Sequence, residues 1–337
     1  MKRVLWQGVL ALALLMAAAA GGVAWWLTQP LPLAAAKVRL AVEPGMSPRE
    51  IARGWVAAGV QTPERLLFES FRWSGESRRI RAGLYEAAAG DTPTDLLHKM
   101  VEGLALPSSV RFVEGWTFRQ LRAELARAEG LKPGTASWSD AEVMAALGAP
   151  GLPAEGRFFP DTYRYLPGAA DLAVLRQAFN AMKLQLEEAW AVRTPDSPLR
   201  SPDEALTLAS IVEKETGVEG DRGLVAGVFV NRLRRGMLLQ TDPTVIYGLG
   251  SAFDGNLRKR DLLADTPFNT YTRAGLPPTP IALPGRASLR AAVQPEPTRA
   301  LYFVARGDGS SEFSEQLADH NRAVNKYQRA ASRGPER

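Results

Sequence analysis

Apolar and polar positions in the first part of the chain repeat one pattern three times: a short β-type run, a turn with glycine, and a Ser or Thr before an amphipathic stretch. Apolar residues in each stretch recur at intervals of three or four, as on the buried face of a helix. An acidic residue or Gln follows each Ser or Thr three positions later, which is the spacing of a capping box. These units predict small α+β modules whose helices begin after Ser47, Thr92 and Thr117.

Glycine and proline cluster between residues 130 and 152 and predict a boundary, beyond which helical patterns dominate. A predicted helix over 171–192 carries an apolar stripe that is typical of core. Pro202 should open a further helix, with the preceding serine as its N-cap. Two β-type runs flank residues 307–309 and predict a hairpin, followed by a closing helix over 316–329.

The N-terminal segment predicts a membrane anchor. Its 20 residues from Gly8 to Leu27 are uncharged. A helix of this length, at about 1.5 Å per residue, is long enough to cross a hydrocarbon core of about 30 Å. The preceding Lys2 and Arg3 favour a cytoplasmic short end, and the pair at 25–26, both Trp, fits the far interface. A cleaved signal peptide is the alternative, because the alanines at 17–19 could form a cleavage site.

Composition limits the classes of function. The 337 residues are 46% hydrophobic, enough to bury a sizeable core. The formal net charge is +5, but Lys and Arg are scattered, so we expect no nucleic-acid partner. The lack of cysteine excludes disulfides and thiolate chemistry. His98 and His320 have no neighbours at metal-ligand spacing, and no glycine-rich phosphate loop or serine-nucleophile elbow occurs, so neither metal nor other cofactor is expected.

Two carboxylates lie near the end of the helix that Pro202 opens. On a helix, Glu215 shares a stripe with large aliphatic residues, and Glu213 shares another with apolar residues. At least one should therefore be partly desolvated, which raises the pKa of a carboxyl as a general acid near neutral pH requires. Alternatively both are solvated and paired with Lys214 or Arg222. The helical pattern alone leaves both interpretations open.

Longer motifs identify a resemblance. They are Glu-Lys-Glu-Thr at 213–216, Leu-Gln-Thr-Asp-Pro-Thr at 239–244, Asn-Thr-Tyr at 269–271 and Gly-Leu-Pro-Pro at 275–278. In this order, after a Phe-Pro-Asp-Thr-Tyr loop at 159–163, they resemble endolytic murein transglycosylases of the MltG/YceG-like type. The resemblance covers essentially the whole chain. It implies an α+β fold with a lysozyme-like active-site helix, in a single-pass protein of the bacterial inner membrane whose catalytic domain is extracytoplasmic.

The resemblance and the patterns together suggest four segments. Residues 1–28 would be a cytoplasmic tip and transmembrane anchor, 29–36 a linker, 37–130 a LysM-like α+β module, and 150–330 a YceG-like catalytic domain. The aromatic-rich loop at 155–163 would open the catalytic domain, where it could pack at the edge of the core or face a sugar ring.

The resemblance also implies the chemistry. Glu215 would be the catalytic acid, since Thr216 follows it as a small hydroxyl residue follows the acid in lytic transglycosylases, and Glu213 would have a supporting role. The acid would protonate the glycosidic oxygen between MurNAc and GlcNAc, and an oxocarbenium-like centre would develop. The MurNAc C6 hydroxyl would then attack C1 and close a 1,6-anhydro ring without water. Amides and phenols can hydrogen-bond a sugar and offer a stacking face, although in loops they often serve turns. Candidate glycan-binding residues are Thr216, Gln240, Thr241, Asp242, Tyr247, Asn269 and Tyr271.

Two other functions stay open at this point. If Asp242 lies about 5–9.5 Å across a cleft from Glu215, water could be activated and the enzyme would be a muramidase-type hydrolase. A non-enzymatic scaffold could instead bind peptidoglycan through the N-terminal module.

The partners that the resemblance implies are peptidoglycan glycan strands, the membrane and peptidoglycan synthases. Internal cleavage of nascent strands would limit their length. The segment 279–285 departs from the family pattern, so its contacts are left undefined.

Overall fold

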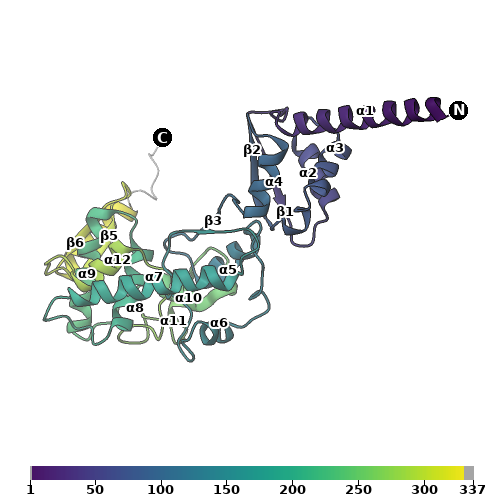
Figure 1. The fold of residues 1–337 in the computed structure, drawn as a ribbon. Helices are drawn as coiled ribbons and strands as arrows, with labels where there is room; N and C mark the ends of the chain where they lie inside the picture. Colours follow the sequence, from purple (N-terminus) through teal and green to yellow (C-terminus); the bar gives the residue numbers. More distant parts are fainter. Residues whose placement is uncertain (1, 330–337) are drawn as a thin grey trace, which may run out of the picture. The chain divides into compact units, whose positions relative to one another are not determined.

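A computed structural model describes residues 2–329. Met1 of the expected cytoplasmic tip and residues 330–337, which include the last residue of the expected catalytic domain, lie outside the described residues. The described chain is mostly helical and contains small two-stranded sheets (Figure 1). The mixed α+β fold class is thus confirmed.

Contacts along the backbone divide the chain into two compact units. The first comprises Met1–Ser109, Ala128–Lys132 and Arg164–Ala170. The second comprises Val110–Arg127, Pro133–Tyr163 and the chain from Asp171 onward. The chain therefore passes between the units several times, and the segment boundaries expected from the sequence stay predictions.

The first unit contains an antiparallel pair of strands and three packed helices. Its capping boxes form as predicted, with Ser47 accepting from the Glu50 amide and Thr92 from the Asp95 amide. Trp55 is fully buried at the centre of its core. The elements are β1 (Lys37–Val42), α2 (Pro48–Ala58), α3 (Glu64–Trp73), the 3-10 turn Ser77–Arg79, β2 (Gly83–Ala88) and α4 (Pro93–Glu102).

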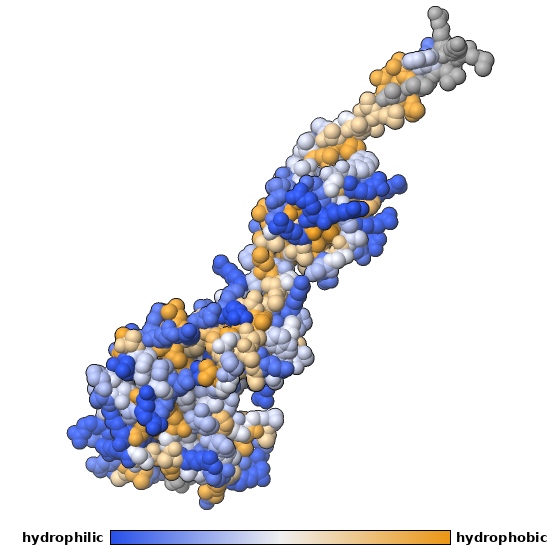
Figure 2. All heavy atoms as spheres, turned by 60° about the horizontal axis from the view of Figure 1, so that its bottom comes forward, coloured by the Kyte–Doolittle hydropathy of each residue, from blue (hydrophilic) through white to orange (hydrophobic). Residues whose placement is uncertain are grey.

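The N-terminal residues form α1 (Lys2–Leu27). Figure 2 shows apolar side chains along this helix in tan and orange, and Leu12, Leu15 and Trp25 are among those exposed. Among the residues that the structure describes, no helix combines the length and the apolar character needed to cross a membrane. The anchor stays a prediction from the sequence.

The core of the second unit is built around α8 (Pro202–Glu215). Ser201 caps this helix through the Glu204 amide, and a proline occupies its first position, as predicted. All residues from 205 to 212 are buried, because neighbouring helices cover α8 on several sides. Both ends of the helix reach the surface, and the C-terminal end carries the glutamate pair at the edge of the core. The covering helices are α7 (Asp171–Ala191), α9 (Glu219–Arg234) and α12 (Arg286–Val293).

The remaining elements are short. The predicted hairpin is confirmed, with Tyr302 opposite Ser314, whereas the predicted closing helix is α-helical only at first and ends in a π-helical turn at Asn325–Arg329. The bounds are β3 (Ser108–Arg111), α5 (Phe118–Arg127), α6 (Asp140–Ala146), β4 (Thr162–Tyr165), α10 (Asp242–Leu249), the 3-10 turn Gly250–Ala252, α11 (Lys259–Leu263), β5 (Tyr302–Ala305), β6 (Ser311–Ser314) and α13 (Leu317–Val324).

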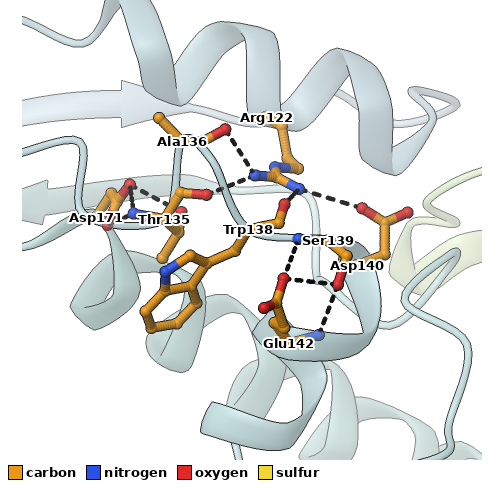
Figure 3. A network of polar contacts seen from close by, with 8 residues as sticks. All are labelled: Arg122, Thr135, Ala136, Trp138, Ser139, Asp140, Glu142 and Asp171. Atoms are coloured by element: carbon orange, nitrogen blue, oxygen red, sulfur yellow. Dashed lines mark hydrogen bonds and ion pairs between the residues drawn. The ribbon is translucent and has the colours of Figure 1, made fainter.

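A polar network holds the loop between α5 and α6 (Figure 3). Arg122 of α5 donates to the carbonyls of Thr135 at 2.6 Å and Trp138 at 2.7 Å, and it pairs with Asp140 at 3.2 Å. Asp171, the first residue of α7, accepts from the Thr135 amide at 2.9 Å and hydroxyl at 2.8 Å. These bonds satisfy loop carbonyls that helices and strands do not, and they fix the position of Asp140.

Candidate active site

Glu215 is the last residue of α8 and is half-buried. Its neighbours one turn back, Ile211 and Val212, are fully buried, so the predicted partial desolvation is present. The Thr241 hydroxyl donates a hydrogen bond to Glu215 Oε1. Burial raises the pKa of the Glu215 carboxyl and the charge of Asp242 adds to this, while the Thr241 bond and the Arg232 cation pull the pKa back down. The net shift is upward, as a general acid needs.

The alternative in which both glutamates form ion pairs finds no support. In the described part of the chain, neither Glu213 nor Glu215 lies within ion-pair distance of a cation. Glu213 Oε2 instead accepts from the Gly285 amide at 2.9 Å. That bond connects α8 to the segment 279–285, which departs from the family pattern, and gives Glu213 a role in positioning this segment.

A buried threonine cluster aims the Thr241 hydroxyl at the acid. The Thr241 amide donates to the Thr270 hydroxyl at 3.1 Å, and the Thr244 and Thr270 hydroxyls lie 2.9 Å apart. The preceding Gln240 has a φ of 50°, the one non-glycine residue with a positive φ in the described chain, and its amide donates to the Thr270 carbonyl at 3.0 Å. A left-handed glutamine costs on the order of 1 kcal/mol. This turn leaves the Gln240 side chain exposed and brings Thr241 inward.

Arg232 stabilises the turn at Gln240 through hydrogen bonds to the carbonyls that precede it. Its guanidinium is buried and donates to the carbonyls of Leu239 at 2.8 Å, Leu238 at 3.2 Å and Leu301 at 2.7 Å. The Tyr302 ring covers it, with 5.2 Å from the Arg232 Cζ to the ring centroid. Sequence reasoning missed this residue, since Arg232 stands beside two other arginines, Arg234 and Arg235, at the end of α9 and nothing in the sequence distinguishes the buried one.

Asn269 shapes a second loop beside the threonine cluster. It is fully buried, and its side-chain amide donates to the carbonyls of Leu262 at 3.0 Å and Ala264 at 2.6 Å. Its side-chain oxygen accepts from the Tyr271 amide at 2.8 Å. These bonds within the protein give Asn269 a role in the turn, one of the two readings that the sequence left open for such residues.

Tyr271 and Asp242 form a pair on the other side of Thr241. The Tyr271 hydroxyl donates to Asp242 Oδ1 at 2.5 Å, and burial raises the pKa of the Tyr271 phenol. Asp242 is exposed and begins α10. The predicted residues Glu215, Thr241, Asp242 and Tyr271 are therefore linked by direct contacts or by adjacency, although they come from three separate motifs.

Two predicted residues have partners elsewhere. The Thr216 hydroxyl accepts from the Val218 amide at 3.0 Å, which stabilises the turn after α8. The Tyr247 hydroxyl on α10 donates to Glu155 Oε2 at 3.1 Å. A direct contact of either residue with a glycan stays a prediction.

Glu155 is a further acid that the sequence did not single out. It is buried, and its Oε1 accepts from the Phe118 amide at 2.9 Å. Burial raises the pKa of Glu155 to about 7. The loop that follows packs inward, since Phe158 is fully buried and stacks on Phe118 with 4.7 Å between ring centroids. The aromatic-rich loop is thus part of the core, the first of the two alternatives that its sequence offered.

The fold is mixed α+β, and the half-buried Glu215 carboxyl with its hydroxyl donor, at the end of the central buried helix, is a candidate general acid. The chain belongs to the YceG-like family, whose model matches residues 40–326.

Individual proteins are also similar to this chain in sequence or structure. The chain is 39% identical over 175 residues to a Bacillus subtilis protein named endolytic murein transglycosylase, a match over 52% of this chain and 48% of that protein. A Streptococcus pneumoniae protein of the same name, from strain D39, is 33% identical over 175 residues, which is 50% of this chain and 31% of that protein. The chain thus spans half or less of these relatives' lengths. A crystal structure of a YceG-like protein from Listeria monocytogenes superposes with a TM-score of 0.56 at 27% identity and covers 85% of this chain and 98% of that one.

Proposed function

We propose that this protein is a peptidoglycan lytic transglycosylase that cuts within glycan strands, with Glu215 as its acid. The observation that carries the proposal is the half-buried Glu215 carboxyl, whose pKa is raised and whose one recorded side-chain partner in the described chain is the Thr241 hydroxyl. Membership of the YceG-like family and the names of the relatives support the substrate class.

The reaction needs one group that gives and then takes a proton. Glu215 donates its proton to the oxygen between MurNAc and GlcNAc, and the bond from that oxygen to MurNAc C1 breaks through an oxocarbenium-like state. The Glu215 carboxylate then removes the proton of the MurNAc C6 hydroxyl. That oxygen bonds to C1 and closes the 1,6-anhydro ring, which restores the protonated acid and consumes no water.

The neighbours of Glu215 suit this cycle. The Thr241 hydroxyl stabilises the carboxylate that exists between the two steps, because a hydrogen bond to the charged form favours that form. Asp242 is engaged by the Tyr271 hydroxyl, which disfavours its use as a base for water. Gln240 is exposed on its left-handed turn, and this exposure supports its proposed contact with the sugar.

The test is mass spectrometry of the ends that the full-length chain produces from isolated glycan strands. The wild type should release fragments with 1,6-anhydro ends, and Glu215→Gln should lower the rate by at least about 10³-fold. The matched control is Glu219→Gln, an exposed acid in the first turn of α9, which should retain activity. Reducing ends would instead indicate the hydrolase with Asp242 as second carboxylate, and no cleavage by the wild type would favour the scaffold.

The proposal extends to an extracytoplasmic site at the bacterial inner membrane, where cleavage of nascent strands would limit their length. It rests on the uncharged run of residues 8–27 alone. Protease added to the outer face of spheroplasts should digest the catalytic part of the full-length chain. Protection of that part from the added protease would contradict this location.

A further inference from the structure

A cavity of about 720 Å³ lies on the surface of the second unit, next to the site of Glu215. Its lining includes Lys214, which precedes Glu215 on α8, and Pro243, which follows Asp242 on α10. Tyr247 of α10 also lines it, together with the first residues of α5. The helix that begins beside the acid therefore forms one wall of the cavity. This volume suits a ligand of several linked groups.

The two cations of the cavity, Arg119 and Lys214, have no anionic partner among residues 2–329. In the described chain, the Arg119 side chain makes no hydrogen bond or ion pair, and Lys214 makes no ion pair. The Lys214 ammonium donates only to the Gly115 carbonyl, at 3.3 Å. Both side chains thus keep donors for a bound group, in contrast to Arg122 nearby, whose two terminal nitrogens both donate to protein acceptors (Figure 3).

The acids of the cavity are already engaged. Asp140 pairs with Arg122 at 3.2 Å. Both oxygens of Glu155 accept hydrogen bonds within the protein, from the Phe118 amide and from the Tyr247 hydroxyl. Burial raises the pKa of Glu155 to about 7, so much of its negative charge is absent near neutral pH. The cavity is therefore positive overall and favours an anion over a cation.

The walls between the charged groups are apolar. Pro243, Ile246, Phe253 and Ile281 all contribute to the lining. An Arg guanidinium matches the geometry of a carboxylate with two parallel hydrogen bonds, and a nearby ammonium adds charge. The cavity thus combines an anion site with surface for short aliphatic side chains, which is the chemistry of an acidic peptide.

We propose that this cavity binds the carboxylate of a peptide branch attached to the glycan strand that is cut at Glu215. The inference rests on the proposed function for the identity of the strand. Arg119 and Lys214 hold the carboxylate, and the apolar walls hold the neighbouring side chains. The enzyme would thereby select strands that still carry peptides.

The binding test does not depend on cleavage. Calorimetry on the full-length Glu215→Gln chain compares a short acidic stem peptide with the same peptide in which every carboxylate is amidated. The acidic peptide should bind at least about tenfold more tightly, and adding Arg119→Gln should remove that preference, because charge-assisted hydrogen bonds of about 1.5–3 kcal/mol correspond to about 10- to 100-fold. The control Arg127→Gln removes an exposed arginine of the same helix outside the cavity, and should leave the preference intact. Equal binding of the two peptides, or binding of neither, would overturn the inference.

A second measurement separates this inference from the proposed function. The wild type is given strands with intact peptides and strands stripped by an amidase, and kcat/KM is compared. Peptide-bearing strands should be cut at least about tenfold better, and this ratio should fall in Arg119→Gln and Lys214→Gln. Equal kcat/KM for both strands would contradict the peptide site while the transglycosylase stands. If neither strand is cut, the proposed function fails and calorimetry alone decides on the cavity.

Discussion

At the scale of single residues, the protonation of Glu215 reflects influences that oppose each other. Burial and Asp242 raise its pKa, whereas Thr241 and Arg232 lower it. A general acid must be protonated before the reaction and must tolerate its charge afterwards. Burial supplies the first condition, and the Thr241 hydroxyl supplies the second.

Replacing Thr241 by Val should therefore shift the pH dependence of cleavage. Loss of the hydroxyl removes a bond to the carboxylate form, so the pKa of Glu215 rises further, and the alkaline limb of kcat/KM moves up by roughly one pH unit. The control is Thr207→Val, which removes a buried hydroxyl that donates to the Asp203 carbonyl within α8. A limb that stays in place in Thr241→Val, or shifts equally in the control, would speak against this contact.

At the scale of elements, the sequence predicts helix starts well and loop geometry poorly. Capping residues such as Ser47, Thr92 and Ser201 act within four residues of themselves, so local pattern is sufficient for α2, α4 and α8. Tertiary contacts are different, since the Thr241 bond to Glu215 joins residues 26 apart in sequence. Nothing local in the sequence indicates the positive φ of Gln240, which only the surrounding packing maintains.

The same limit explains the residues that were missed. Arg232 and Glu155 act through burial, and burial of a charged side chain follows from which elements pack together and not from periodicity. The family resemblance located Glu215 and the motifs around it. The contacts of those motifs with each other, and the engagement of Tyr247 by Glu155, required the fold.

Arg232→Lys should loosen the junction between α9 and the turn before Thr241. A lysine keeps the charge but has a single nitrogen, which cannot reach the carbonyls of Leu239 and Leu301 together in the geometry of a guanidinium. The free energy of unfolding in urea should fall by about 2 kcal/mol. Arg234→Lys, on the same helix but in an exposed pair with Asp196, should change it by less than about 0.5 kcal/mol. Equal effects would contradict the bracing role.

At the scale of the molecule, the second unit contains all contacts of the site. α8 forms its centre, α9 and α10 contact α8 from separate parts of the sequence, and the first residues of α5 line the neighbouring cavity. Glu155 joins two of these helices, because its oxygens accept from the first residue of α5 and from Tyr247 of α10. A single buried acid thus contributes to how the unit holds together.

The free energy of unfolding of this unit should depend on pH through the titration of Glu155. The pKa of Glu155 is about 7 in the folded protein, above the ordinary value of 4.5 for a glutamate side chain, so the folded state binds its proton more tightly. This contribution is complete below about pH 4.5 and is lost as pH rises through about 7, by up to about 3 kcal/mol. Urea unfolding at about pH 5 and about pH 8 should show a larger fall for the wild type than for Glu155→Gln. Identical falls would contradict the raised pKa.

The most direct test of the central claim is cleavage in water labelled with heavy oxygen. The account requires the MurNAc C6 oxygen, and not water, to attack C1 under the control of Glu215. Mass spectrometry of the new strand ends should therefore find no label, together with the mass of an anhydro ring, and Glu215→Gln should produce no such ends. Label incorporated at the new MurNAc ends would show that water attacks, and would replace ring closure by hydrolysis.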